Sequence, residues 1–327
     1  MKRTIFILTL LLPVCFLFAQ NDNESDINQE GNGNFVKVTQ VGDENYSDVY
    51  TYGNNNEKSF INQEGKGENW SDVIQFDGNG NSANVNQLNN YTRTRDLAES
   101  EVFQYGNGNH ANIDQIVSKH NNLYPNGGIV DSWVEQSGNR NTAKVDQEGL
   151  GLKARVIQNG NASKAKIFQG TSKYYTGLAY RSDATIRQGP NASNNSKAKQ
   201  HQVGLQNDAF IKQNSGNGSI AEQIQINAKG KIKTDKSFDV NNADIEQKKG
   251  GANTAYQLQY FNNKGTLQNR ANAYQEGSRN YSHEAQFGGD NWSDVYQDGN
   301  GNTAKVYQSS HGVTGPTTYN ATLPFKH

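Results

Sequence analysis

The chain has 327 residues, of which 33% are hydrophobic, and its 31 basic and 32 acidic side chains leave a net charge of −1. So polar a composition excludes a conventional apolar core and leaves disorder or stacked polar ladders. The near-neutral charge gives no sign of nucleic acid or an anionic membrane as a partner. Because the one cysteine, Cys15, lies in the N-terminal apolar run, a disulfide scaffold is excluded as well.

Residues 1–19 have the composition of a secretory signal peptide. Two basic residues precede an apolar run from Ile5 to Phe18, and Ala19 ends it before a polar sequence begins. The run is shorter than the roughly 18 residues of a transmembrane helix, so membrane insertion is not expected. A lipoprotein signal ending at Cys15 is the alternative, although the preceding Pro-Val matches it poorly. The sequence therefore predicts cleavage after Ala19 and a secreted mature protein.

After this segment, nearly the whole chain repeats one short unit. The clearest copies lie between Asn291 and Gln308, where Asn-x-(Ser/Ala)-x-Val-x-Gln occurs twice, separated by Asp-Gly-Asn-Gly. Marked positions two residues apart have the period of a β-strand, so these Asn, Ser/Ala, Val and Gln side chains share one face. Gly accepts a positive φ, and Asn and Asp tolerate it, so the residues between the copies predict a tight turn.

The terminal Gln of each unit recurs with a spacing typical of a solenoid. Twenty-two units can be placed, with Thr51 standing where one Gln is expected. Two placements are the weakest: Gln200, where Gln202 competes, and Gln259, where Gln257 occupies the preceding inward position. The other predicted ladder glutamines are Gln29, Gln40, Gln63, Gln75, Gln87, Gln104, Gln115, Gln136, Gln147, Gln158, Gln169, Gln188, Gln213, Gln225, Gln247, Gln275, Gln286, Gln297 and Gln308.

The intervals between units alternate in length. From odd to even units they are all 11 or 12 residues, whereas from even to odd units they range from 11 to 22. The long insertions therefore fall on one side of the alternation, as two strands per rung predict. We expect an all-β solenoid of about eleven two-strand rungs over residues 20–308, followed by a tail at 309–327. The insertions are Leu88–Asp96, Ile116–Gly128, Gly170–Arg181, Gln225–Val240 and Tyr260–Gln268.

Stacked rungs place like residues over like at a spacing of about 4.8 Å. A side-chain amide has donors and an acceptor, so a column of Gln or Asn can hydrogen-bond to itself along the axis. Ala or Ser lets the facing strands approach, and Val or Ile supplies dry contact. The result is a narrow core edged by amides. The predicted ladder asparagines are Asn23, Asn34, Asn45, Asn69, Asn81, Asn109, Asn141, Asn207, Asn241, Asn253, Asn269, Asn280, Asn291 and Asn302.

The residues between the marked positions are expected to face solvent. They include charged side chains such as Lys305 and Asp294 and recurring aromatic ones such as Trp70 and Tyr296. The aromatic residues either reinforce the sheet by stacking or form a surface for lateral fibre contact or adhesion. The insertions are surface loops or contact loops for a partner. Neither end of the repeat carries an evident cap, so the open strand edges are expected to recruit further copies.

The combined unit resembles the curlin repeat, Gln-x-Gly-x-Gly-Asn-x-Ala-x3-Gln. Gln104–Gln115 and Gln297–Gln308 match it fully, Gln29–Gln40 has Val in place of Ala, and Gln136–Gln147 has Arg140 in place of the second Gly. The resemblance implies a secreted subunit of curli, the adhesive functional amyloid fibres of bacterial biofilms. Such subunits cross the outer membrane unfolded and polymerise at the cell surface. The implied partners are further copies of the chain, related curlin subunits and the curli-type outer-membrane secretion machinery.

Other roles stand beside that of a main fibre subunit. The chain has more repeats than the common curli subunits, long one-sided insertions and many Asn at the first strand position, so a nucleator or accessory subunit is an alternative. A monomeric adhesin-like solenoid is another. An enzyme is not expected, and no catalytic residue, metal or cofactor is predicted, because the acidic residues are scattered and no ligand spacing connects His110, His120, His201, His283, His311 and His327.

Overall fold

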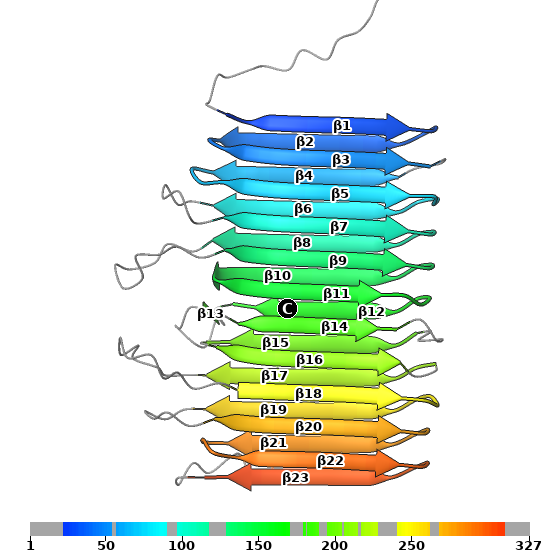
Figure 1. Ribbon diagram of the computed structural model, residues 1–327, viewed down its shortest axis with the longest axis vertical. Helices are drawn as coiled ribbons and strands as arrows, with labels where there is room; N and C mark the ends of the chain where they lie inside the picture. Colours follow the sequence, from blue (N-terminus) through cyan, green and yellow to red (C-terminus); the bar gives the residue numbers. More distant parts are fainter. Residues whose placement is uncertain are drawn as a thin grey trace, which may run out of the picture.

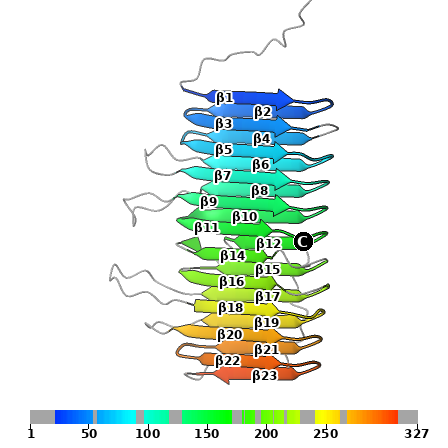
Figure 2. The same ribbon diagram turned by 45° about the vertical axis from the view of Figure 1, so that its right-hand side comes forward.

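The computed structural model describes residues 22–53, 57–89, 97–117, 129–170, 179–180, 182–189, 195–204, 206–214, 217–227, 241–261 and 268–310. In these residues the chain forms two parallel β-sheets stacked face to face, seen face-on in Figure 1 and turned by 45° in Figure 2. The predicted signal peptide, the tail beyond residue 310 and most of the insertions lie outside the described residues, so their predictions stay untested.

The two sheets take alternate strands of the chain. Sheet A consists of β1 (Glu24–Glu30), β3 (Asn45–Tyr52), β5 (Asn69–Phe76), β7 (Ala98–Tyr105), β9 (Val130–Ser137), β11 (Leu152–Gln158), β14 (Asp183–Gln188), β16 (Asn207–Asn214), β18 (Asn241–Lys248), β20 (Asn269–Glu276) and β22 (Trp292–Asp298). Sheet B consists of β2 (Phe35–Gly42), β4 (Lys58–Gly65), β6 (Ser82–Asn89), β8 (His110–Val117), β10 (Thr142–Leu150), β12 (Lys164–Gln169), β15 (Lys197–Val203), β17 (Ile220–Asn227), β19 (Thr254–Phe261), β21 (Tyr281–Phe287) and β23 (Thr303–Ser309).

One strand of sheet A and the next strand of sheet B form a rung, and eleven such rungs confirm the predicted solenoid. Each strand pairs in parallel with the equivalent strand one rung away, so like residues lie over like. In sheet A, for example, Val49 pairs with Val73 and Val73 with Val102. The repeat therefore fixes the register, because a shift by one residue would turn the buried face of a strand to solvent.

The core is a thin layer between the two sheets. Branched residues of sheet A, such as Val73 and Ile186, and of sheet B, such as Val85 and Ile113, are fully buried. Ala or Ser occupies the preceding inward position in most rungs, which lets the sheets approach closely. Large apolar side chains therefore supply only a narrow strip of the interior, and amides line both sides of it.

Aromatic side chains stack along the outer faces from rung to rung. The rings of Tyr274 and Tyr296 are parallel with centroids 4.9 Å apart, and those of Phe35 and Phe60 lie 5.5 Å apart. Such contacts between neighbouring strands stabilise a sheet by roughly 0.2–1 kcal/mol each. Stacking between strands is thus present, and Tyr296 remains 69% exposed at the last rung.

The five long insertions all connect a strand of sheet B to a strand of sheet A, so they leave the slab at one edge, as predicted. Two details differ from the sequence prediction. The insertion after β12 contains a two-residue strand, β13 (Ala179–Tyr180), whose backbone extends the pairing of β10. A short insertion also lies on the opposite edge, between β14 and β15.

The sequence prediction lacks this short insertion because it places Gln200 in the ladder, which is wrong. In the structure Gln202 pairs with Gln169 and Gln225, whereas Gln200 pairs with Ile167 and Gln223. Both glutamines face inward because they are two residues apart, and the pairing of Ala198 with Ala165 decides the register. The prediction for Gln259 is confirmed, because it pairs with Gln225 and Gln286.

The two glycine positions of the repeated turn have different surroundings. Gly106, the first, has a φ of 100°, and a Cβ there would lie 2.2 Å from the carbonyl oxygen of Gly138 in the next rung. Gly80, a second glycine, has a φ of 74° but no atom within 4 Å of a Cβ. This explains why Arg140 can occupy a second-glycine position, with a φ of 57°, while the first position must stay small.

We therefore expect Gly106→Ala to lower the free energy of unfolding by about 1–3 kcal/mol more than Gly80→Ala. Both substitutions place a Cβ at positive φ, which costs about 1–2 kcal/mol, but only the first forces a clash with the next rung. Urea denaturation of the two variants measures the difference. Equal loss of stability would show that the close approach between turns is not what the first glycine is needed for.

Candidate functional site at the glutamine ladders and end rungs

The inward glutamines of sheet B form one continuous hydrogen-bonded column. Each side-chain Nε2 donates to the Oε1 of the glutamine in the next rung, at 2.8–3.2 Å. Between the two end rungs these side chains are fully buried. In chain order the column consists of Gln40, Gln63, Gln87, Gln115, Gln147, Gln169, Gln202, Gln225, Gln259, Gln286 and Gln308.

Sheet A carries a second column with the same donor direction. It begins at Gln75, because Thr51 occupies the rung before it, and the Gln75 Oε1 accepts from the Ser59 hydroxyl at 3.0 Å. Gln29 lies in the first rung and is exposed. The Nε2 to Oε1 distances are 2.8–2.9 Å between Gln75, Gln104, Gln136, Gln158, Gln188, Gln213, Gln247, Gln275 and Gln297.

The same amides also join the two sheets. Gln87 Nε2 donates to the backbone carbonyl of Trp70 at 2.8 Å and to that of Ala98 at 2.9 Å, both in sheet A. Gln104 in sheet A donates in turn to the carbonyl of Ser82 in sheet B at 3.1 Å. Each glutamine therefore satisfies its donors both along the axis and across the rung, which a buried amide requires. Loss of one side chain leaves polar groups unpaired in two directions.

The predicted asparagines do not form uniform columns. In sheet A the side-chain amides bond directly at 2.7–3.2 Å, but the four middle rungs carry Ala98, Val130, Leu152 and Ser182 instead. The bonded runs are Asn23, Asn45 and Asn69, and then Asn207, Asn241, Asn269 and Asn291.

In sheet B the asparagines hold the turns instead of bonding to one another through their amides. Asn109 Nδ2 donates to the carbonyl of Gly138 at 2.9 Å, and its Oδ1 accepts the backbone N–H of Asn141 at 3.0 Å. The same pattern or part of it recurs, and Glu57 and three serines interrupt the column. A repeat pattern shows that Asn faces inward but cannot distinguish these two bonding modes. The sheet B asparagines are Asn34, Asn81, Asn109, Asn141, Asn253, Asn280 and Asn302.

A further polar column, which the sequence reasoning missed, replaces the branched residues of sheet B toward the C-terminus. Gln200, Gln223, Gln257 and Glu284 follow Ile167 at this inward position, and their side chains bond in sequence at 3.0 Å. The signal was present as Gln-x-Gln in three successive sheet B units. It could have been found by asking which inward positions are polar where the repeat expects Val or Ile.

Glu284 ends this column as an acceptor. Its Oε1 accepts from Gln257 at 3.0 Å and its Oε2 from the Ser293 hydroxyl at 2.5 Å, while the next rung offers only Val306. The side chain is fully buried. Burial raises the pKa of Glu284 from 4.5 to about 7, although the hydrogen bonds from Ser293 and Gln257 act in the opposite direction. Repulsion from Asp294, an exposed residue of β22, raises this pKa further.

A raised pKa means that the folded chain binds this proton more tightly than the unfolded chain does. We expect the resulting stabilisation to be fully present below about pH 4.5 and to be lost as the pH rises to about 7, by on the order of 3 kcal/mol. Urea midpoints measured from pH 4.5 to about pH 8 test this. Glu284→Gln should flatten the dependence relative to Glu64→Gln, which changes an exposed residue of β4. Identical slopes for both variants would contradict the assignment.

The end rungs differ from the interior rungs because no further rung covers them in the described residues. Every residue of β1 is exposed, and the inward residues of β23 are only half-buried. Because all glutamine donors point toward higher residue numbers, Gln297 and Gln308 lack a glutamine acceptor beyond them, and Gln29 and Gln40 lack a glutamine donor before them. The two ends of the slab are thus complementary in hydrogen bonding.

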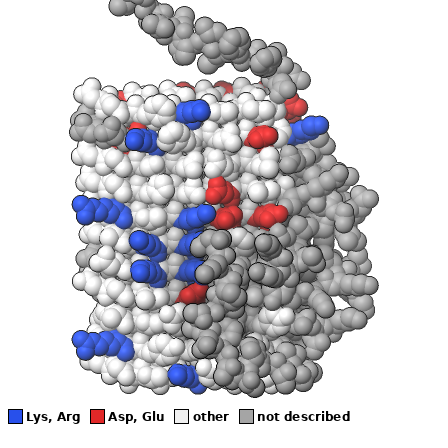
Figure 3. Space-filling model, turned by 180° about the vertical axis from the view of Figure 1, so that it is seen from behind, with Lys and Arg blue, Asp and Glu red and all other residues white. Residues whose placement is uncertain are grey.

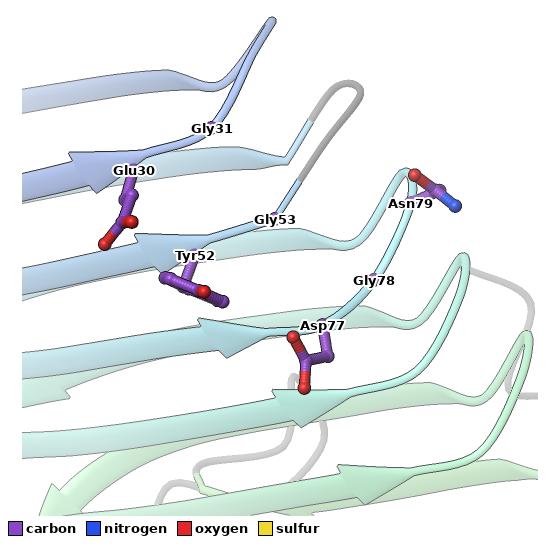
Figure 4. A pocket seen from close by; sticks show the side chains of 7 residues that line it. All are labelled: Glu30, Gly31, Tyr52, Gly53, Asp77, Gly78 and Asn79. Carbon is purple, nitrogen blue, oxygen red and sulfur yellow. The ribbon is translucent and has the colours of Figure 1, made fainter.

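An open depression of about 480 Å³ lies at the turn edge of the first three rungs. Figure 4 shows the side chains of Glu30, Tyr52 and Asp77 coming from successive strands and turns there. The remaining lining residues are glycines and Asn79, so the lining contains no His, Cys, Lys or Arg for acid–base or nucleophilic chemistry. Among the described residues, no group of three or more His, Cys, Asp or Glu could hold a metal ion.

Comparison with known families bears on the repeat itself. A family model described as the curlin associated repeat matches residues 31–65, which run from the first turn through β4. The strands of the other rungs pair in the same register as β2 and β4 of this segment, with Gln over Gln except at Thr51. Residues 31–65 therefore carry a curlin-associated repeat. A search of curated proteins finds no match. Within the described residues, no helix has the length and apolar character to cross a membrane.

Proposed function

We propose that this curlin-repeat protein is a structural subunit of extracellular amyloid fibres of the curli type, which serve adhesion and the biofilm matrix. The observation that carries the proposal is the pair of open, complementary end rungs. Unpaired strand edges are templates for further chains unless they are covered or blocked. Here each strand of sheets A and B already pairs with an equivalent strand of its own chain, so a second copy needs no new kind of contact.

The last rung matches the first at every inward position. If β22 and β23 of one copy stack on β1 and β2 of the next, each amide meets an amide and each apolar residue an apolar one. The facing residues are then Asn291 and Asn23, Ser293 and Ser25, Val295 and Ile27, Gln297 and Gln29, Asn302 and Asn34, Ala304 and Val36, Val306 and Val38, and Gln308 and Gln40. This agreement supports one continuous solenoid through many copies.

The direction of the glutamine donors favours one orientation of stacking. Joining the C-terminal rung to the N-terminal rung places the Nε2 of Gln297 and Gln308 against the Oε1 of Gln29 and Gln40. Joining two N-terminal rungs would place acceptor against acceptor. The proposed fibre is therefore polar, with the subunits head to tail, and copies of this chain or of related curlin subunits are the proposed partners, delivered by a curli-type outer-membrane secretion machinery.

Purified mature protein provides the direct test. Fibres of stacked rungs should bind amyloid dyes and give reflections at about 4.8 and about 10 Å, from the strand and sheet spacings. A protein that stays a soluble, dye-silent monomer after long incubation would reject the fibre role and favour a monomeric adhesin-like solenoid.

The end glutamines should matter most for growth. We expect Gln40→Ala and Gln308→Ala each to slow elongation by roughly fivefold, because each removes hydrogen bonds worth about 1 kcal/mol at the growing junction. Asn121→Ala, in the insertion between β8 and β9, is the control and should leave the rate unchanged. Seeded dye-binding kinetics provide the measurement. Equal rates for all three variants would count against growth through the end rungs.

A further inference from the structure

Five lysines form a compact array on the outer face of sheet B. Lys144, Lys166 and Lys199 lie over one another in three successive rungs, and Lys164 and Lys197 form a second column two residues away along the strands. Successive rungs are about 4.8 Å apart. Lys164 and Lys197 are exposed, and the other three are half-buried. Figure 3 shows this gathering of blue side chains near the middle of one face.

The charge of this lysine array is only partly balanced within the molecule. Lys144 lies 3.9 Å from Asp114 and 4.0 Å from Asp146, and Lys199 lies 2.7 Å from Glu222. No carboxylate of the described residues forms an ion pair with Lys164, Lys166 or Lys197. Burial, followed by repulsion from Lys144 and Lys199, lowers the pKa of Lys166. Stacked like charges are unfavourable, so the array is a surface at which an anionic partner relieves repulsion.

Sheet A carries a matching array of the opposite sign on its outer face. Asp48, Asp72 and Glu101 lie over one another in three successive rungs, and Glu99 and Asp131 form a second column. All five are half-buried and none has an ion-pair partner among the described residues. Burial, followed by repulsion from Asp48 and Glu101, raises the pKa of Asp72 to about 6. We name these five residues the acidic array.

The two arrays cannot meet within one molecule, because they lie on opposite faces of the slab. They share the same axial repeat, and each sets a column of three charges beside a column of two, which lies one rung further along in the acidic array. We propose that the lysine array of one copy docks on the acidic array of a second copy, so that neighbouring solenoids associate side by side through the outer faces of sheets B and A. Because each copy carries both arrays, the contact does not close on itself and can extend to a bundle. The proposal rests on the proposed fibre, and it concerns lateral contact rather than growth.

Three sets of preformed fibres test this docking. The first variant carries Lys164→Glu, Lys166→Glu and Lys197→Glu, which makes both faces acidic. The second carries Asp72→Lys, Glu99→Lys and Glu101→Lys, which makes both faces basic. The control reverses three exposed cations outside the array and outside the end rungs, with Lys58→Glu, Lys66→Glu and Arg279→Glu. Dye binding and fibre diffraction establish first that each protein forms fibres, so failure of growth is distinguished from failure of docking.

Low-speed sedimentation and electron microscopy then measure bundling. Wild-type and control fibres should bundle at about 0.1 M salt and disperse at about 1 M, where the Debye length falls from about 10 to about 3 Å. Each array variant alone should sediment roughly tenfold less, because like charges oppose docking, and mixing the two variants should restore bundles. Bundling that is insensitive to salt, or an array variant that bundles like the control, would overturn the proposal.

If no fibres form, the same comparison is made on the soluble solenoid by analytical ultracentrifugation. Wild-type and control chains should self-associate at low salt. The two array variants should associate with each other but not with themselves. Wild-type chains that stay monomeric at about 0.1 M salt, or array variants that self-associate like the control, would overturn the proposal by this route as well.

Discussion

The structure depends on one distance, the separation of about 4.8 Å between successive strands. At this spacing an amide in one rung reaches its equivalent in the next, so Gln147 bonds to both Gln115 and Gln169. An unsatisfied buried amide costs about 1–3 kcal/mol, so each glutamine is favourable only while both neighbours are in place. Interior rungs therefore support one another, and a polar chain acquires an ordered core without a large apolar one.

The axial spacing also limits what the turns can contain. Gly106 must approach the carbonyl of Gly138 too closely for any side chain, and Asn109 bonds to that same carbonyl. Strand ladders, glutamine columns and asparagine-bound turns thus impose the same repeat at three points of the rung. The outward side chains need no equivalent residue in the next rung. They differ from rung to rung, and this variation allows lysines to gather on one face and carboxylates on the other.

Much of this architecture could be read from the sequence, because a strict period of two within strands leaves few ways to arrange the rungs. Gln200 shows where the reading fails. Two glutamines separated by one residue both satisfy the period, and only the pairing of Ala198 with Ala165 selects between them. The bonding mode of Asn109 could not be predicted either, because it depends on a carbonyl 29 residues away. The lysine array could not be predicted for the same reason, because it forms only when pairing between rungs brings Lys164 beside Lys197.

The edge from which all five long connections leave has its own consequence. Both ends of each connection are anchored by paired strands, such as β8 and β9, so its length is almost unconstrained by the repeat. Doubling a flexible loop costs only about 0.6 kcal/mol in closure entropy. One rim of the slab can therefore change its displayed peptides over evolutionary time while the scaffold beneath stays the same, and a fibre built from such slabs would carry that variable decoration in a single line along its length.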